Sequence, residues 1–222
     1  MKCDFKIMGV PKRISNIIYL CYKLGLDFAK DVAMDEVYSG VPAKTSLHAF
    51  SMPAEHDITH RCIIQDDIEL CMGFVEAVHH LIELYPDNIL SLYSNSTKLS
   101  AYPKGTIIDT GGMINGQALV IPLKYREQII PFYRACIKAG EKADDFLYGL
   151  YAKKKGVKVL TCYPNLVKHM GVEDTTLDHK CARFKSHNYT GEDASKINFT
   201  KVKGNLGMAL SISLKLLRDI EI

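Results

Sequence analysis

Two adjacent carboxylates occupy the position in this sequence that most needs a chemical explanation. Asp66 and Asp67 follow directly on the apolar run 61–65, so we expect them at the end of a buried strand. Two negative charges held there repel each other unless a cation or strong hydrogen-bond donors lie beside them. Carboxylate oxygens suit Mg²⁺ or Mn²⁺, and such an ion can bridge to a diphosphate and neutralise the charge that develops as a bond to phosphate breaks. The alternative is that both aspartates only cap a helix that follows them.

A histidine much later in the chain is a candidate partner for this pair. His169 lies ahead of Gly171, in a loop that we expect after a buried strand. Imidazole is a good ligand for ions of the Mn²⁺ class, and a loop at the carboxyl end of a strand can reach Asp67. We therefore predict that Asp67 and His169 bind one divalent ion. A single histidine is more often a surface or core residue, and that alternative stays open.

Asp144 and Asp145 form a second acidic pair, at the expected start of a helix. Acidic residues favour the first turn of a helix through its dipole, which is sufficient reason for their presence. In a functional interpretation, one carboxylate is the general base that takes a proton from an acceptor hydroxyl. We prefer Asp145 to Asp144 for this role.

The remaining candidates are glycines and cations beside expected strand ends. Gly9, Pro11, Lys12 and Arg13 form the first loop and could contact a nucleotide or its phosphates, although the two cations could equally be solvated charges ahead of a helix. The stretch 111–118 is rich in glycine but matches neither GxGxxG nor GxxxxGK[ST], so it does not indicate a dinucleotide or P-loop site. Its glycines could let backbone approach a ligand closely or only form a turn.

Strands alternating with helices are expected to position these residues. Strands are predicted at 5–8, 33–38, 61–65, 89–93, 117–121 and 157–162, and helices at 14–24, 74–85, 122–138 and 143–155. We expect a loop over 95–112, an irregular basic tail over 177–204, and a last helix over 208–218. The fold class is α/β, with a Rossmann-like central sheet, mixed but mostly parallel, flanked by helices. Such sheets bind ligands beyond the carboxyl ends of their strands.

Composition limits the class of protein. The 222 residues are 47% hydrophobic, which suits one domain at 1–176 with a basic tail and helix at 177–222 packing on it. The net charge of +3 allows a polyanionic partner without requiring one. Seven cysteines without a CxxC pair are typical of a reduced compartment. Since no apolar stretch approaches the ~18 residues of a membrane span, we expect a cytoplasmic protein with no membrane partner.

These features together resemble the nucleotide-sugar glycosyltransferases of GT-A fold, especially small bacterial and phage members related to lipopolysaccharide-type transferases. The resemblance covers roughly 6–176 and is carried by five motifs in this order: the opening 7–13, the stretch 63–67 that ends in Asp66 and Asp67, Gly116-Gln117-Ala118, Asp144-Asp145, and the run 164–169 that ends in His169.

The resemblance implies a DxD-type site that holds Mn²⁺ or Mg²⁺ through Asp67 and His169, with Asp66 near the ribose or the metal. The donor would be a UDP-sugar, by analogy UDP-glucose, contacted also by Gly9, Pro11, Arg13, Asp35 and Gln117. Gln65 stands where the family often has an acid, which leaves the metal with fewer protein ligands.

The acceptor is the most open part of this prediction. Phage members resemble enzymes that glycosylate hydroxymethylated pyrimidines in DNA, in which case the protein would act in the host cytoplasm. The basic tail would suit phosphate contact and base stacking through Lys180, Arg183, Lys185, Lys196, Lys201 and Lys203 with Phe184, Tyr189 and Phe199. The alternatives are a solvated lysine-rich lid, a transferase acting on a cell-surface glycan, and a non-catalytic DNA-binding module on the same scaffold.

Overall fold

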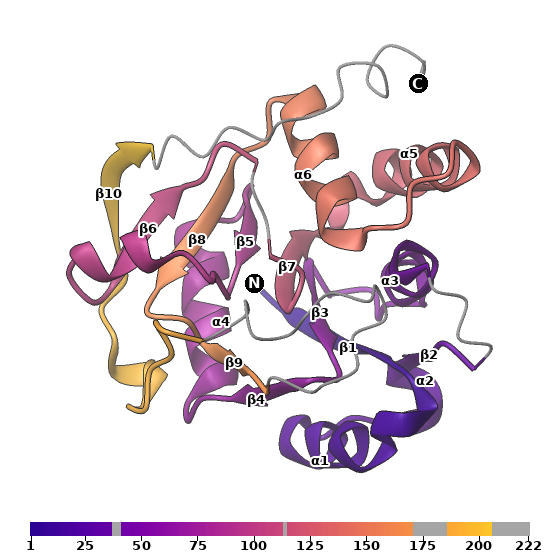
Figure 1. Cartoon of the computed structure of the whole chain (residues 1–222), viewed down its shortest axis with the longest axis horizontal. Coiled ribbons are helices and arrows are strands. Elements are labelled where there is room, and N and C mark those ends of the chain that lie inside the picture. Colours follow the sequence, from indigo (N-terminus) through magenta and orange to yellow (C-terminus); the bar gives the residue numbers. More distant parts are fainter. Residues whose placement is uncertain (37–40, 113–114, 171–185, 206–222) are drawn as a thin grey trace.

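A computed structural model describes residues 1–36, 41–112, 115–170 and 186–205 (Figure 1). The strands are β1 (Cys3–Gly9), β2 (Val32–Met34), β3 (His60–Gln65), β4 (Ile68–Leu70), β5 (Ile89–Ser91), β6 (Thr106–Asp109), β7 (Ala118–Pro122), β8 (Val159–Tyr163), β9 (Val167–His169) and β10 (Thr200–Asn205). The α-helices are α1 (Ile14–Leu24), α2 (Phe28–Asp31), α3 (Pro42–Ser51), α4 (Phe74–Leu84), α5 (Arg126–Lys138) and α6 (Asp144–Lys155). Short 3-10 helices are η1 (Pro11–Arg13), η2 (Thr97–Ala101), η3 (Leu123–Tyr125) and η5 (Ala194–Lys196).

The central sheet has the strand order β10-β6-β8-β5-β7-β3-β1-β2. β1 is parallel to β2 and β3, and β5 is parallel to β8. Both β3 and β5 are antiparallel to β7. The strands that share one direction are therefore β1, β2, β3, β5 and β8. The chain is therefore a mixed α/β protein with a mostly parallel central sheet flanked by helices. A separate two-stranded sheet joins β4 to β9.

Each face of the central sheet has its own hydrophobic core. Side chains of α1 and α4 pack on one face together with Cys62 and Ile64 of β3. Those of α3, α5 and α6 pack on the other face together with Ile63. This alternation along β3 is the period of two that a strand buried on both sides requires.

α1 shows how the local sequence sets these elements. Its inward residues Ile17, Leu20 and Cys21 recur at helical spacing and are buried. The helix ends where Gly25 takes a left-handed conformation, with φ of 65°, and its N–H bonds to the carbonyl of Cys21. Both ends of this helix were predictable from the sequence.

Several sequence predictions differ from the structure. The predicted loop 95–112 contains η2 and β6. β6 was missed because Thr106 and Asp109 beside its isoleucines give it a polar sequence. Pro122 is both the last residue of β7 and the N-cap of η3, so the predicted helix 122–138 is present as η3 followed directly by α5. Asp67 is followed by β4, so the aspartate pair does not cap a helix. The predicted strand 33–38 is shorter, and helices α2 and α3 were not predicted.

The prediction of an irregular tail is confirmed only in part where the tail is described. Residues 186–193 and 197–199 belong to no named helix or strand, but η5 and β10 were not predicted, and β10 pairs in parallel with β6 at the sheet edge. The predicted helix 208–218 and Lys180, Arg183, Phe184 and Lys185 lie outside the described residues. Six cysteines in the described ranges are buried and free of disulfides. None of the helices in those ranges has the length and apolar character needed to cross a bilayer.

Candidate active site

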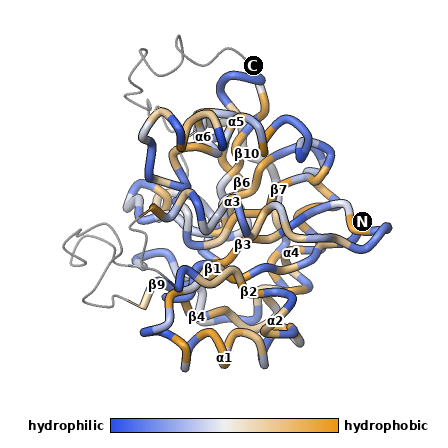
Figure 2. Tube along the Cα trace, turned by 90° about the vertical axis from the view of Figure 1, so that its right-hand side faces the viewer, coloured by the Kyte–Doolittle hydropathy of each residue, from blue (hydrophilic) through white to orange (hydrophobic). Residues whose placement is uncertain are grey.

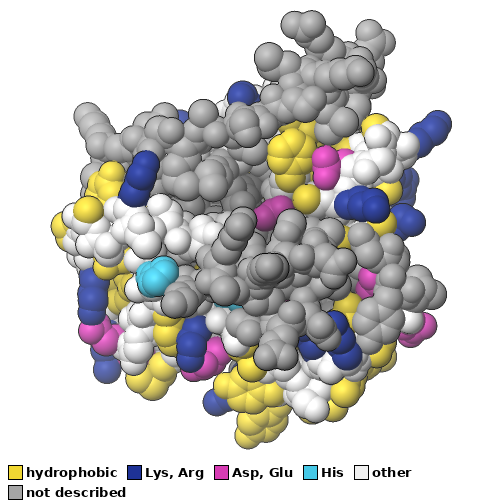
Figure 3. Space-filling model, viewed as in Figure 1, with side chains coloured by type: hydrophobic (Ala, Val, Ile, Leu, Met, Phe, Trp, Pro, Cys, Tyr) yellow, Lys and Arg dark blue, Asp and Glu magenta, His cyan; other side chains and the backbone are white. Residues whose placement is uncertain are grey.

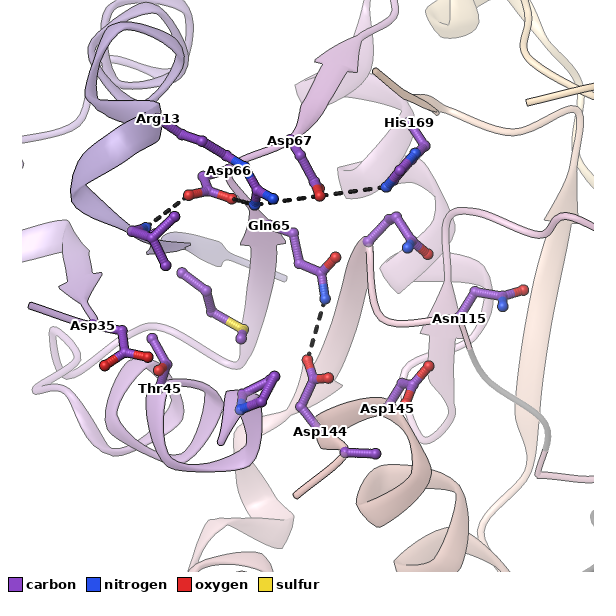
Figure 4. A pocket seen from close by; sticks show the side chains of 16 residues that line it. Arg13, Asp35, Thr45, Gln65, Asp66, Asp67, Asn115, Asp144, Asp145 and His169 are labelled. Carbon is purple, nitrogen blue, oxygen red and sulfur yellow. Dashed lines mark hydrogen bonds and ion pairs between the residues drawn. The ribbon is translucent and has the colours of Figure 1, made fainter. Parts of the chain in front are cut away.

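One cavity, of about 230 Å³, lies at the carboxyl ends of β1, β2 and β3 (Figure 4). The amino ends of α3 and α6 and the segment before β7 close its other walls. Charged and amide side chains line it: Arg13, Asp35, Gln65, Asp66, Asp67, Asn115, Gln117, Asp144, Asp145 and His169. Met8, Gly9, Val10, Pro42, Thr45 and Ala143 complete the lining. This is the edge at which α/β sheets bind their ligands.

Arg13 holds the first acidic pair in place. Its Nη1 lies 2.6 Å from Oδ1 of Asp66 and 3.4 Å from Oδ2 of Asp67. The other oxygen of Asp66 accepts a hydrogen bond of 2.7 Å from the backbone N–H of Val10. Burial raises the pKa of Asp66, and the guanidinium of Arg13 and the N–H of Val10 oppose that rise. Arg13 therefore supplies a positive charge beside both aspartates.

β4 and β9 bring His169 to Asp67. The two strands pair antiparallel with Ile68 opposite His169, and the N–H of Met170 donates to the carbonyl of Asp67 at 2.8 Å. As a result, Nε2 of His169 lies 3.3 Å from Oδ2 of Asp67, and both side chains are buried. The backbone N–H of His169 is fixed further by Oγ of Ser186, at 2.8 Å.

Asp67 and His169 are the residues of the cavity that could hold a divalent cation. Oδ1 of Asp67 is buried and has no hydrogen-bond partner among the described residues, which is costly for a carboxylate oxygen. Two ligands at right angles on a Mg²⁺-sized ion, each about 2.1 Å from it, are about 3 Å apart. That spacing is close to the 3.3 Å between Nε2 of His169 and Oδ2 of Asp67. In the described ranges no three His, Cys, Asp or Glu side chains are grouped to hold a metal. Phosphate and water ligands would have to complete the shell, as is usual for Mg²⁺.

The second acidic pair has a different environment. Burial, reinforced by the neighbouring charge of Asp145, raises the pKa of Asp144 to about 7. Burial also raises the pKa of Asp145, whose Oδ1 accepts from the N–H of Phe146 at 2.8 Å. Since no Lys or Arg ion pair to either carboxylate occurs in the part of the chain that the structure describes, the pair can hold a proton near neutral pH.

Gln65 lies between the two acidic pairs in Figure 4. Its Nε2 donates to Oδ2 of Asp144 at 3.4 Å. An acid at this position would put a third carboxylate beside Asp144 and Asp145. The amide of Gln65 avoids that repulsion. Gly116 lies close by, where an added Cβ would come within 3.2 Å of Oδ2 of Asp144. Oε1 of Gln117 is buried with no hydrogen-bond partner in the described ranges, so the cavity wall presents an unused acceptor.

The structure brings nearly all the predicted site residues to this cavity. Gly9, Arg13, Asp35, Asp66, Asp67, Gln117, Asp144, Asp145 and His169 line it, whereas Pro11 is exposed at the start of η1 and does not. Sequence reasoning missed Thr45 and Asn115 as lining residues. Asn115 stands in the glycine-rich stretch already singled out, and Pro42 at the first turn of α3 was a usable helix-start signal.

Two aromatic residues of the tail do not have the role predicted for them. Phe199 is 3% exposed and belongs to the core. Tyr189 packs against the same core, its hydroxyl donates to the carbonyl of Leu70, and Lys168 covers its ring. Neither ring is available to stack on a nucleic-acid base, because each is already packed in the fold.

No protein-family model matches this sequence, and a search of curated proteins finds no match either. The function must therefore be argued from the cavity itself.

Proposed function

We propose that this protein is a metal-dependent glycosyltransferase that moves a sugar from a UDP-sugar, by analogy UDP-glucose, to an acceptor hydroxyl. The observation that supports this most is the division of one cavity into two ends. At one end Arg13 and His169 both lie against Asp67, and we call this end the cation end. At the other end Asp144 and Asp145 have pKa values raised by burial and no Lys or Arg ion pair among the described residues. Transfer from a nucleotide diphosphate needs positive charge at the leaving group and a proton acceptor at the incoming hydroxyl.

The residues at the cation end would hold the diphosphate. Asp67 and His169 would bind Mn²⁺ or Mg²⁺, which supplies the charge that stabilises a departing diphosphate. Arg13 lies between Asp66 and Asp67 and would face the same phosphates. Asp66 has both oxygens engaged, so its contribution is to orient Arg13. Asp35, buried at the end of β2, would contact the nucleoside.

The residues at the other end would handle the sugar and the acceptor. Gln117 lines the cavity, and its Oε1, which has no partner among the described residues, would accept from a sugar hydroxyl. Asp145 would take the proton of an acceptor hydroxyl, and its raised pKa makes it a better base than an ordinary aspartate. Asp144, with a pKa of about 7, would modulate the charge of Asp145.

The acceptor is best sought by experiment. The full chain is incubated with Mn²⁺ and a panel of UDP-sugars, together with DNA containing hydroxymethylpyrimidines, ordinary DNA, or a glycan. UDP release and the masses of nucleosides and glycans are then measured. We expect UDP release that needs Mn²⁺, with a hexose-sized gain on one acceptor class. Steep loss of transfer with rising salt would favour DNA, whereas transfer to a neutral glycan would barely respond.

A matched pair of variants controls this assay. Asp67→Asn removes the carboxylate charge in the cavity, whereas Glu69→Gln removes a carboxylate that is 44% exposed and pairs with Lys168 at the surface. Glu69→Gln should keep activity and Asp67→Asn should lose it. Failure of the unmodified protein to release UDP from any donor, with or without Mn²⁺, would reject the proposal and favour a non-catalytic role.

A further inference from the structure

α1 exposes an unusually apolar outer surface. Of the nine large hydrophobic side chains that are exposed in the described residues, five lie within fifteen positions: Ile14, Ile18, Tyr19, Tyr22 and Phe28. We name these five, four on α1 and Phe28 at the start of α2, the α1 face. Tyr22 is 83% exposed and Ile18 is 57% exposed, so the water contact is extensive. Contiguous exposed apolar surface of this kind marks an interaction site more often than scattered single residues do.

α4 provides an internal comparison. α1 and α4 each have eleven residues and pack on the same core. The outward positions of α4 include Glu76, His80 and Glu83, as expected for a helix with one face in water. The outer side of α1 instead exposes Ile14, Ile18, Tyr19 and Tyr22 beside Ser15 and Lys23. Figure 2 shows hydrophobic residues along its course at the lower edge of the molecule.

The exposed charges within 12–30 are mostly positive. Lys12, Lys23 and Lys30 are exposed in or beside it, against one exposed acid, Asp27, in 12–30. Lys30 lies 3.9 Å from Asp27, but both are exposed and such surface pairs are weak. Figure 3 shows hydrophobic side chains along the lower edge, where α1 lies in Figure 1, with Lys or Arg side chains and acidic side chains nearby.

We propose that the α1 face lies on the surface of an anionic membrane. Tyrosine rings prefer the boundary between lipid and water, isoleucine side chains enter the acyl region, and lysines are attracted to anionic headgroups. A second copy of this chain is a poorer occupant. Two α1 helices packed antiparallel about a twofold axis would set Lys12 of each copy towards Lys23 of the other. This inference does not depend on the proposed function.

The α1 face starts at the cavity wall, because Arg13 lines the cavity and Ile14 follows it directly. Asn16, on the same helix, donates to the carbonyls of Asp66 and Ile68. A membrane beneath α1 would therefore lie against the helix that supports the cation end of the cavity.

The test is sedimentation of the full chain with vesicles. One set contains phosphatidylglycerol and phosphatidylcholine, and the other phosphatidylcholine alone. We expect the protein to pellet with the anionic vesicles. Ile18→Gln with Tyr22→Gln should weaken this binding at least tenfold, while Leu84→Gln, a matched change at a 44% exposed residue of α4, should leave it unchanged. Lys12→Gln and Lys23→Gln should each weaken it about fivefold, as about 1 kcal/mol per cation predicts.

Circular dichroism melting of each variant checks that the fold is retained, which we expect because the changed side chains are exposed. Failure of the unmodified protein to pellet with either vesicle would overturn the proposal. Equal pelleting by the Ile18/Tyr22 variant and the unmodified chain would do so as well. A dimer in sedimentation equilibrium that is lost in the Ile18/Tyr22 variant would assign the face to a second copy instead.

Discussion

Asp66-Asp67 and Asp144-Asp145 are the same dipeptide on two walls of one cavity, yet their surroundings differ. The first pair receives Arg13, the N–H of Val10 and the imidazole of His169. The second pair receives an amide and backbone N–H groups and has no ion pair with Lys or Arg among the described residues. Identical residues therefore meet different partners on the two walls: cationic groups lie beside the first pair, whereas burial without a cation raises the pKa of Asp144 to about 7.

The largest expected effect comes from removing the charge of Asp67, whose Oδ1 has no hydrogen-bond partner among the described residues. Asp67→Asn should lower turnover by roughly a thousandfold, as loss of a group that stabilises transition-state charge does. It should also abolish Mn²⁺ binding measured by calorimetry, with Glu69→Gln as the control. Retention of full turnover and Mn²⁺ affinity by Asp67→Asn would show that the two pairs do not differ in this way.

The second effect tests the other wall. Asp145→Asn should lower turnover about a hundredfold, in the range expected for a general base, and should leave Mn²⁺ affinity unchanged. The matched change Asp109→Asn alters a carboxylate on β6 that does not line the cavity and should be neutral. If Asp145→Asn weakened Mn²⁺ binding as strongly as Asp67→Asn, the cavity would have one undivided acidic site.

A smaller effect should follow from His169→Ala. Because Asp67 would keep its place beside Arg13, Mn²⁺ affinity should fall only about tenfold, and activity should recover at higher Mn²⁺ concentration. His80→Ala, an exposed histidine on α4, is the control. An unchanged Mn²⁺ titration in His169→Ala would remove this residue from the cation end.

The smallest effect concerns stability and pH. The pKa of Asp144 is raised to about 7 in the folded protein, so the folded state binds the proton more tightly than the unfolded chain. Stability from this group is complete below the unfolded pKa and is lost as pH rises through about 7. Between pH 6 and pH 8 the protein should lose about 1 kcal/mol relative to Asp144→Asn.

Urea unfolding of both proteins at the two pH values measures this difference, with the exposed Glu76→Gln as the control. Parallel pH profiles for the unmodified protein and Asp144→Asn would show that the pKa of Asp144 is not raised in the folded protein.

The sequence predicted the fold where short-range patterns decide it. The helical spacing of α1 with Gly25, and the break from Ile64 to Asp66 at the end of β3, gave the right elements. β4 and β9 have three residues each, too few for a period of two to be visible, so His169 was expected in a loop. α3 was missed although it starts at Pro42.

The candidate site was predicted as a set of residues but not as an arrangement. That Asp66, Asp67 and His169 lie at one cavity followed from strand ends meeting at one edge of the sheet. That Arg13 neutralises Asp66 could not be read from the sequence, because the two are 53 positions apart and meet only after β1 and β3 pair.

The register between β4 and β9 also decides whether the imidazole of His169 faces Asp67. With Ile68 opposite His169, the imidazole turns inward and Lys168 turns outward to Glu69. A slip of one position would reverse both directions, exposing the imidazole and directing an ammonium group toward Asp67. An insertion of a single residue between Leu166 and His169 should therefore abolish the contact between His169 and Asp67 while leaving the rest of the molecule folded.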